Sequence, residues 1–222
     1  MVLCIFGKIA GSYDRVVEAP CVIPGLIDSH VHLTFDCRPG VFYESVDNVI
    51  KIFMIHGVLG VRDTGNALSN VVLFTTVNGM FCISMTYSIE KPPLHRPFMR
   101  PVRSVDDVTG EVEKAFVEGC SWFKLYVNID EEIAREAVAR AHEKDLRVTG
   151  HVNGIGVDKA IEVGYDCIEH LDSIARLKPS IGLIEAWENI DEGVIEEIAR
   201  KMASKNIVLV PTASVYRAAM EN

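Results

Sequence analysis

The sequence predicts an α/β fold: a parallel (β/α)8 barrel of the TIM type, incomplete because the eighth strand is not in these 222 residues. Two observations lead to this prediction. Short apolar runs recur along the chain, and stretches with helical periodicity follow them. Such alternation is typical of βαβ units in a parallel sheet, and the seven runs found here exceed the strand number of most open sheets.

The predicted strands are brief, rich in Val, Ile and aromatic residues, and bounded by Gly, Pro or Asp. In chain order the runs are CVIPGLIDSHVHL (21–33), HGVLGVRDTG (56–65), MFCISMTYSI (80–89), SWFKLYV (121–127), DLRVTGHV (145–152), YDCIEHL (165–171) and NIVLVPTAS (206–214).

Three stretches between these runs have the spacing of amphipathic helices, namely 104–119, 129–145 and 190–206. Ser104 and Asp130 are the expected N-caps of the first two helices. The last residues, VYRAAMEN, are expected to begin the helix after the seventh strand. Residues 1–22 are predicted to form a short N-terminal β segment, and residues 23–222 the barrel with strands one to seven.

The composition favours an ordinary globular protein. Hydrophobic residues make up 49% of the chain and charged residues 24%, which is enough apolar material for a sizeable core. The net charge of −9 argues against nucleic acid or an anionic membrane surface as partner. No apolar stretch reaches the roughly 18 residues of a membrane span. The six cysteines form no CxxC pair, so we expect a cytoplasmic protein without a disulfide framework.

Four of the seven histidines fall at the ends of predicted strands. His30 and His32 end the first run, and alternate residues of a strand point to the same side. His151 ends the fifth run and His170 the sixth. Because active sites of parallel barrels assemble at the C-terminal ends of the strands, these residues predict a metal site there. A solvated or hydrogen-bonded pair remains the alternative for His30 and His32.

The other three histidines are expected to have structural or solvent-exposed roles. His56 and His142 come late in helical stretches, where a histidine interacts favourably with the helix C-terminus. His95 lies in the loop KPPLHRPF.

Lys124 stands inside the apolar run SWFKLYV. Burial would lower the pKa of its amine and favour the neutral form. A neutral amine can react with carbon dioxide to give a carbamate, whose two oxygens could bridge two metal ions. The alternative is a lysine at the edge of the strand whose ammonium group reaches water.

Three carboxylates near strand ends are expected to have supporting roles. Asp28 has the same parity as the two first histidines and could face inward behind them. Asp63 is expected to bond to a neighbouring loop. Glu169 precedes His170 in a strand and is therefore expected to face away from it.

Several of these stretches together resemble the amidohydrolase superfamily. PGLIDSHVHL looks like its first-strand signature, and GVLGVRDTG resembles its second strand. GHVNGIGVDKAIEVGYDCIEHL and VLVPTASVY are closest to the imidazolonepropionase-like and prolidase-like branch.

This resemblance implies a metal-dependent hydrolase in which a metal-bound hydroxide attacks the C–N bond of an amide, peptide or cyclic amide. One or two divalent ions, expected to be zinc, would be bound. By position, His30 and His32 would hold one ion, carboxylated Lys124 would bridge, and His151 and His170 would hold the other. The superfamily's strand-eight aspartate, which takes a proton from the attacking water, has no counterpart in these residues, so the catalytic base is not identified.

Two alternatives remain open. The first is a mononuclear enzyme of the imidazolonepropionase or deaminase type, although HVNGIG lacks the glutamate typical of deaminases. The second is a truncated barrel that binds metal without turnover. An open barrel leaves unpaired strand edges, so we expect a homo-oligomer or completion by a further C-terminal segment.

The substrate is expected to be a small molecule, bound by the loops that follow the strands. FDCRPGVFYES and IEKPPLHRPFMRP are the main candidate loops. Arg96 could hold a substrate carboxylate, and Tyr126 and Asn153 could line the pocket.

Overall fold

The computed structural model describes residues 19–33, 42–65, 82–96, 99–179, 181 and 183–221. Its elements, in chain order, are β1 (Leu26–Val31), α1 (Phe42–Ile55), β2 (Val58–Asp63), β3 (Cys82–Glu90), β4 (Arg100–Pro101), α2 (Val105–Val117), β5 (Trp122–Leu125), α3 (Glu131–Glu143), β6 (Arg147–Gly150), α4 (Val157–Val163), β7 (Cys167–Glu169), α5 (Asp172–Ala175), α6 (Leu183–Glu188), α7 (Glu192–Ser204), β8 (Val208–Val210) and α8 (Ala213–Glu221).

The strands form one parallel sheet in the order β1-β2-β3-β5-β6-β7-β8. Each of the seven predicted runs overlaps one of these strands, so the α/β fold with a parallel sheet is confirmed. The two-residue strand β4 was not predicted, and it pairs with β3 beside the main order. Among the described residues β1 does not pair with β8, so the barrel is incomplete.

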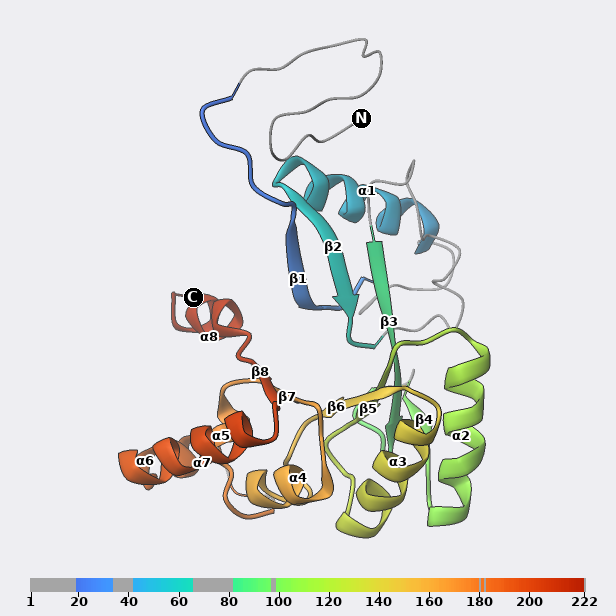
Figure 1. Cartoon of the computed structure of the whole chain (residues 1–222), viewed down its shortest axis with the longest axis vertical. Helices are drawn as coiled ribbons and strands as arrows, with labels where there is room; N and C mark the ends of the chain where they lie inside the picture. Colours follow the sequence, from blue (N-terminus) through green and yellow to red (C-terminus); the bar gives the residue numbers. More distant parts are fainter. Residues whose placement is uncertain are drawn as a thin grey trace.

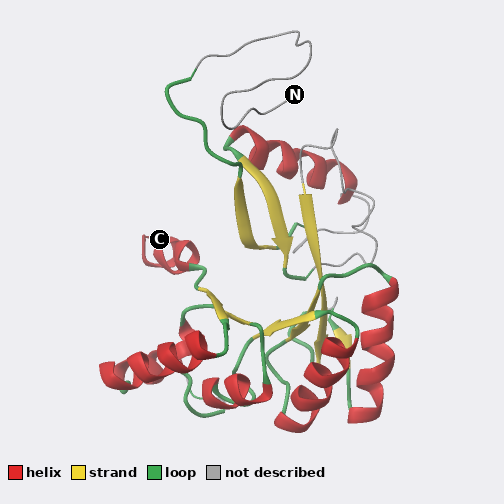
Figure 2. Cartoon of the chain, in the orientation of Figure 1, coloured by secondary structure: helices red, strands yellow, loops and turns green. Residues whose placement is uncertain are grey.

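Helices separate most of the described strands along the chain, and they cover the outer side of the curved sheet (Figures 1 and 2). Helix α2 packs against α3, α3 against α4, and α4 against α7. Helices α2, α3 and α7 coincide with the three predicted helical stretches. Ser104 and Asp130 occupy the expected N-cap positions, and the Asp130 carboxylate accepts a hydrogen bond from the backbone N–H of Ile133 at 3.0 Å.

The hydrophobic core lies between the sheet and this helical layer. Alternate residues of β5, including Phe123 and Leu125, are fully buried and join a cluster with residues of α2, α3 and α4. The intervening positions of the strands carry polar side chains that are also buried: Ser88, Glu90, Lys124, Thr149 and Glu169. Because successive side chains point to opposite faces, the inner face of the sheet is polar while its outer face is apolar.

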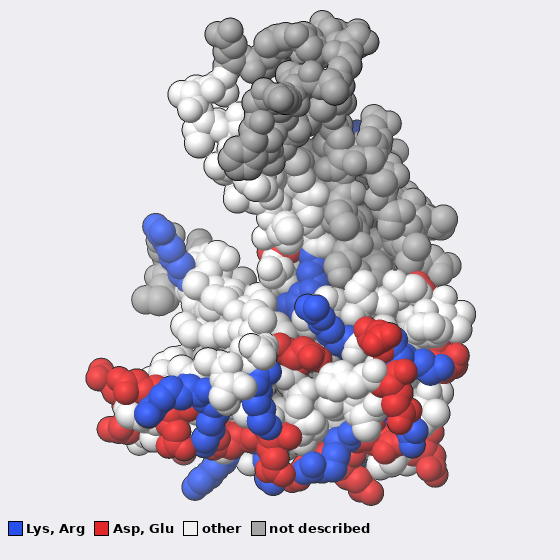
Figure 3. Space-filling view, in the orientation of Figure 1, with Lys and Arg blue, Asp and Glu red and all other residues white. Residues whose placement is uncertain are grey.

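The outside of the helical layer carries mixed charge. Figure 3 shows Lys, Arg, Asp and Glu side chains intermingled over this part of the surface. Many of these groups form ion pairs along one helix, such as Arg135 with Glu131 and Arg140 with Glu136.

Two predictions concern the chain's ends and its relation to a membrane. Residues 1–18 of the predicted N-terminal β segment lie outside the described residues, and residues 19–22 belong to no helix or strand. Within the part of the chain that is described, no helix is both long and apolar enough to cross a bilayer.

Candidate metal centre

The candidate ligands lie at one edge of the sheet, because all of them are at or near the C-terminal ends of parallel strands. His30 lies in β1, and His32 follows its last residue. Lys124 lies in β5, while His151 and His170 directly follow β6 and β7. In parallel strands the C-terminal ends share one edge, so residues separated by 140 positions can meet there.

Four imidazole rings meet at this edge, and we call His30, His32, His151 and His170 the histidine cluster. The ring centres of His30 and His32 are 5.2 Å apart, those of His30 and His170 are 4.6 Å apart, and those of His151 and His170 are 4.5 Å apart. The structure therefore brings these four predicted residues together.

Three of the rings are anchored through their Nδ1 atoms. His30 Nδ1 lies 2.7 Å from Glu169 Oε2, and His32 Nδ1 lies 2.7 Å from the carbonyl oxygen of Gly65. Both partners only accept hydrogen bonds, so Nδ1 carries the proton in these rings and Nε2 keeps its lone pair. His170 Nδ1 lies 2.8 Å from Thr212 Oγ1. Anchors of this kind orient histidines that bind metals through the opposite nitrogen.

His151 has an unsatisfied buried atom. Its Nε2 is inaccessible to water and has no hydrogen-bond partner. The ring centre lies 4.5 Å from that of Tyr126 and 4.5 Å from that of His170. Because a buried polar atom without a partner is costly, this nitrogen is suited to a ligand that enters the cluster.

Burial lowers the pKa of all four imidazoles in the histidine cluster and so favours their neutral form. Burial, followed by the charge of Lys124, lowers the pKa of His32 to about 3. Burial and the neighbouring His30 lower the pKa of His170 to about 4, and burial holds the pKa of His151 well below its ordinary value. Neutral imidazole is the form that binds a metal ion. The donor set therefore fits a divalent ion of the zinc type.

Within the described residues, no three His, Cys, Asp or Glu side chains already meet at ion-binding distance. Binding an ion therefore requires the rings of the histidine cluster to move toward a common point.

Lys124 is fully buried at the centre of the sheet, so the reading of an ammonium group that reaches water is wrong. Strand β5 is paired with β3 and β6, so Lys124 lies on an inner strand and not at an edge of the sheet. The Nζ atom donates to the carbonyl oxygen of Thr64 at 3.0 Å. Burial lowers the pKa of this amine to about 8, which makes the neutral, nucleophilic form accessible near neutral pH.

The expectation that Glu169 faces away from His170 is wrong, because both side chains approach the ring of His30. Glu169 bonds to His30 Nδ1, while the ring of His170 lies 4.6 Å from the ring of His30. Strand β7 ends at Glu169, and His170 has a left-handed backbone with φ of 69°. Strand alternation therefore no longer applies at His170.

The remaining carboxylates have local partners. Asp28 Oδ1 accepts the backbone N–H of His30 at 3.1 Å. Asp63 Oδ1 accepts the N–H of Gly65 at 3.1 Å, which confirms its expected role in the loop. Glu90 is fully buried on β3, and its Oε1 lies 2.7 Å from Nδ1 of His95.

The candidate substrate-binding residues lie beside the histidine cluster or near it. Tyr126 stacks edge-on against His151, and burial raises the pKa of its hydroxyl while the charge of nearby Arg96 lowers it. Asn153 lines a cavity of about 510 Å³, and its Oδ1 is buried without a hydrogen-bond partner. Loops after β3, β5 and β6 form this cavity together with Arg176, which follows α5. In the predicted loop FDCRPGVFYES, residues 35–41 lie outside the described part of the chain.

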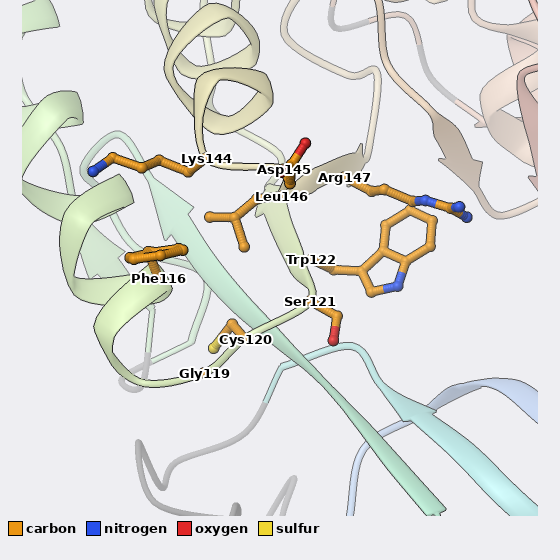
Figure 4. Close-up of a pocket in the computed structure, with 9 residues that line it drawn as sticks. All are labelled: Phe116, Gly119, Cys120, Ser121, Trp122, Lys144, Asp145, Leu146 and Arg147. Carbon is orange, nitrogen blue, oxygen red and sulfur yellow. The ribbon is translucent and has the colours of Figure 1, made fainter.

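A second cavity of about 440 Å³ lies at the opposite ends of β5 and β6 (Figure 4). It is lined by Phe116, Gly119, Cys120, Ser121, Trp122, Lys144, Asp145, Leu146 and Arg147. It lies at the N-terminal ends of these strands, whereas the histidine cluster lies at the C-terminal edge, so it is separate from the candidate metal centre.

Comparison with known proteins gives a family and a fold. The model of the Amidohydrolase family matches residues 21–221. No curated protein matches the chain.

Solved structures with the same fold include three at low sequence identity. An ochratoxinase from A. niger has a TM-score of 0.67 and 16% identity, covering 89% of this chain and 54% of its own. A putative prolidase from Bifidobacterium longum has a TM-score of 0.55 and 17% identity, covering 81% and 54%. A bottromycin amidohydrolase has a TM-score of 0.55 and 19% identity, covering 80% and 38%. The chain thus spans about half the length of the first of these proteins.

Proposed function

Because the chain belongs to the amidohydrolase family, we propose that it supplies the metal-binding residues of a metal-dependent hydrolase that cleaves a C–N bond in a small amide, peptide or cyclic amide. The observation that carries the proposal is the histidine cluster, in which four neutral imidazoles converge at the C-terminal edge of a parallel sheet.

The residues fit a metal site by the chemistry of their donors. His30 and His32 keep the lone pair on Nε2, and His151 Nε2 is buried without a partner. In the proposal these residues and His170 hold the ion or ions, which we expect to be zinc. A bound divalent ion would supply an acidified water and would polarise the carbonyl of the substrate.

The number of bound ions depends on whether the amine of Lys124 is carboxylated. Its amine attacks the carbon of carbon dioxide and loses one proton, which gives a carbamate with two oxygen donors. A carboxylated Lys124 would support two ions, and an unmodified amine would support one. The buried, unusually acidic ammonium group of Lys124 favours the carboxylated form.

Other residues of the chain would orient the substrate. Asn153 Oδ1 is an unsatisfied acceptor and would receive an N–H of the substrate. Tyr126 packs against His151 and would limit access of water to the cluster. Arg96 would attract a carboxylate of the substrate from the exposed rim.

Metal binding tests the proposal directly. Purified protein, stripped with a chelator and dialysed against zinc, should retain at least one equivalent. The double variant His30→Ala with His32→Ala should lose at least half of it, because two ligands are removed. His142→Ala is the matched control, since this exposed histidine pairs with Asp166 on the outside of the fold. The proposal fails if the wild type retains less than one equivalent and the double variant retains the same amount.

A further inference from the structure

Behind the histidine cluster, the Glu169 carboxylate is surrounded by donors from three other strands. His30 of β1 lies 2.7 Å from Oε2, and Arg62 of β2 donates from Nη2 to Oε1 at 2.6 Å. Thr149 of β6 also donates to Oε1 through its hydroxyl. Glu169 is fully buried, so these side chains are the environment that sets its charge and its position.

The guanidinium group of Arg62 pairs with the Glu169 carboxylate at 2.6 Å, and an ion pair of this kind favours the ionised form of the carboxylate. Arg62 and Thr149 both donate to Oε1, which leaves Oε2 for the imidazole of His30. An ionised carboxylate only accepts hydrogen bonds, so the proton of His30 must sit on Nδ1.

Arg62 connects this carboxylate to the backbone beside His30. Its Nε donates to the carbonyl oxygen of Ser29 at 2.7 Å, while its Nη2 holds Glu169. The guanidinium group lies over the ring of Trp122, with Cζ 4.5 Å from the ring centre. One rigid side chain therefore fixes both the strand that carries His30 and the acceptor that faces its ring.

We propose that Glu169, held by Arg62 and Thr149, is a positioning residue that keeps His30 in its Nδ1–H form and directs Nε2 toward the metal. This inference rests on the proposed function, because it assigns a metal to the histidine cluster. Stability alone does not explain this buried ion pair, since such pairs often stabilise a fold less than apolar residues of similar volume.

The informative variant is Glu169→Gln, which keeps the size of the side chain and removes its charge. The amide oxygen can still accept from Arg62 and Thr149, and the NH2 group then faces His30 Nδ1. Two donors cannot face each other, so the His30 proton moves to Nε2 and blocks the nitrogen that binds metal. We expect the dissociation constant for zinc to rise roughly 10–100-fold.

A spectroscopic measurement reports the cause directly. The ¹⁵N spectrum of zinc-free wild type should show His30 protonated on Nδ1, with the signal assigned by its loss in His30→Gln. In Glu169→Gln the same ring should be protonated on Nε2. A merely structural role would lower the melting temperature without changing the His30 tautomer.

Glu90→Gln is the matched control. Glu90 is also a fully buried glutamate at the end of a strand, and it also pairs with a histidine, His95. Since His95 is not in the histidine cluster, this variant should leave the zinc dissociation constant within about twofold of wild type and the His30 tautomer unchanged.

The possible results separate this inference from the proposed function. A wild type that binds no zinc would overturn the proposed function. A wild type that binds zinc, with Glu169→Gln unchanged in affinity and tautomer, would overturn the positioning role alone. If Glu169→Gln does not fold, the wild-type spectrum decides, because a His30 ring protonated on Nε2 contradicts the proposal.

Discussion

At the scale of single residues, the chemistry of this protein depends on polar groups that folding places out of water. Lys124, Glu169 and Arg62 are buried on the inner face of the sheet, where barrels usually carry Val, Ile and Leu. Buried charged groups are costly unless they are paired. Here the buried charged groups surround the histidine cluster, so the free-energy cost of burying them is explained by the site and not by packing of the core.

Carboxylation of Lys124 is the prediction that belongs to this scale. Protein incubated with zinc and ¹³C-labelled bicarbonate should give a carbamate carbon signal, because the buried amine is neutral in part near its pKa of about 8. The signal should be absent in Lys124→Met. It should persist in Lys144→Met, which removes a partly exposed lysine that pairs with Glu113. Identical spectra for wild type and Lys124→Met would contradict the carbamate and favour a mononuclear site.

The sequence alone predicted the residues of the histidine cluster but not what lies behind them. His30, His32, His151 and His170 were recognisable because each ends an apolar run. Glu169 was assigned to the wrong side, since strand alternation cannot anticipate the left-handed backbone of His170. Arg62 lies within a run whose pattern predicts only a strand, and its partner Glu169 is 107 positions away. Contacts over such separations are set by the strand order and not by local pattern.

At the scale of elements, the close pairing of β5 with β6 determines how Lys124 and His151 approach each other. Gly150 pairs with Leu125, the neighbour of Lys124. A Cβ atom at Gly150 would lie only 2.3 Å from the carbonyl oxygen of Leu125, so the two strands can come together only because this residue is glycine.

Gly150→Ala should therefore lower the free energy of unfolding by on the order of 1–3 kcal/mol, because the strands must separate. Gly110→Ala is the matched control, since Gly110 lies in α2 with nothing within 4 Å of the added methyl group. It should stabilise the protein by about 0.5–1 kcal/mol through helix propensity. Urea denaturation of both variants measures the difference, and equal effects of the same sign would contradict this account of the strand contact.

Element prediction from the sequence succeeded for three of the longer helices, although not for α1, which has 14 residues. Helices α2, α3 and α7 each have 13 residues and repeated apolar positions, and all three were predicted. Helix α4 has only 7 residues and α5 only 4, which is too short for a clear period. Strand β4, with two residues, gives no pattern at all.

At the scale of the whole molecule, the sheet has two terminal strands, β1 and β8, that pair on one side only among the described residues. These strands carry exposed apolar side chains, with Ile27 74% and Val208 55% exposed. Unpaired strand edges of this kind tend to pair with other chains. The open sheet was anticipated from the sequence, because the strand runs could be counted along it.

We therefore predict that this 222-residue chain self-associates at micromolar concentration. Ile27→Lys should increase the monomer fraction in sedimentation velocity, because a charge at a strand edge opposes pairing. Ile55→Lys provides the control: Ile55 is 78% exposed but ends helix α1 and not a strand. A chain that is monomeric without substitution, or that responds equally to both changes, would contradict edge pairing.

The position of a bound zinc ion tests the account as a whole most directly. A crystal structure of the zinc-loaded protein, with anomalous data collected at the zinc edge, should show at least one peak in the histidine cluster. The imidazole nitrogens of His30 and His32, or of His151 and His170, should lie at about 2.0–2.1 Å from it. A zinc peak elsewhere on the molecule, with none of the four imidazole rings binding an ion, would contradict the account.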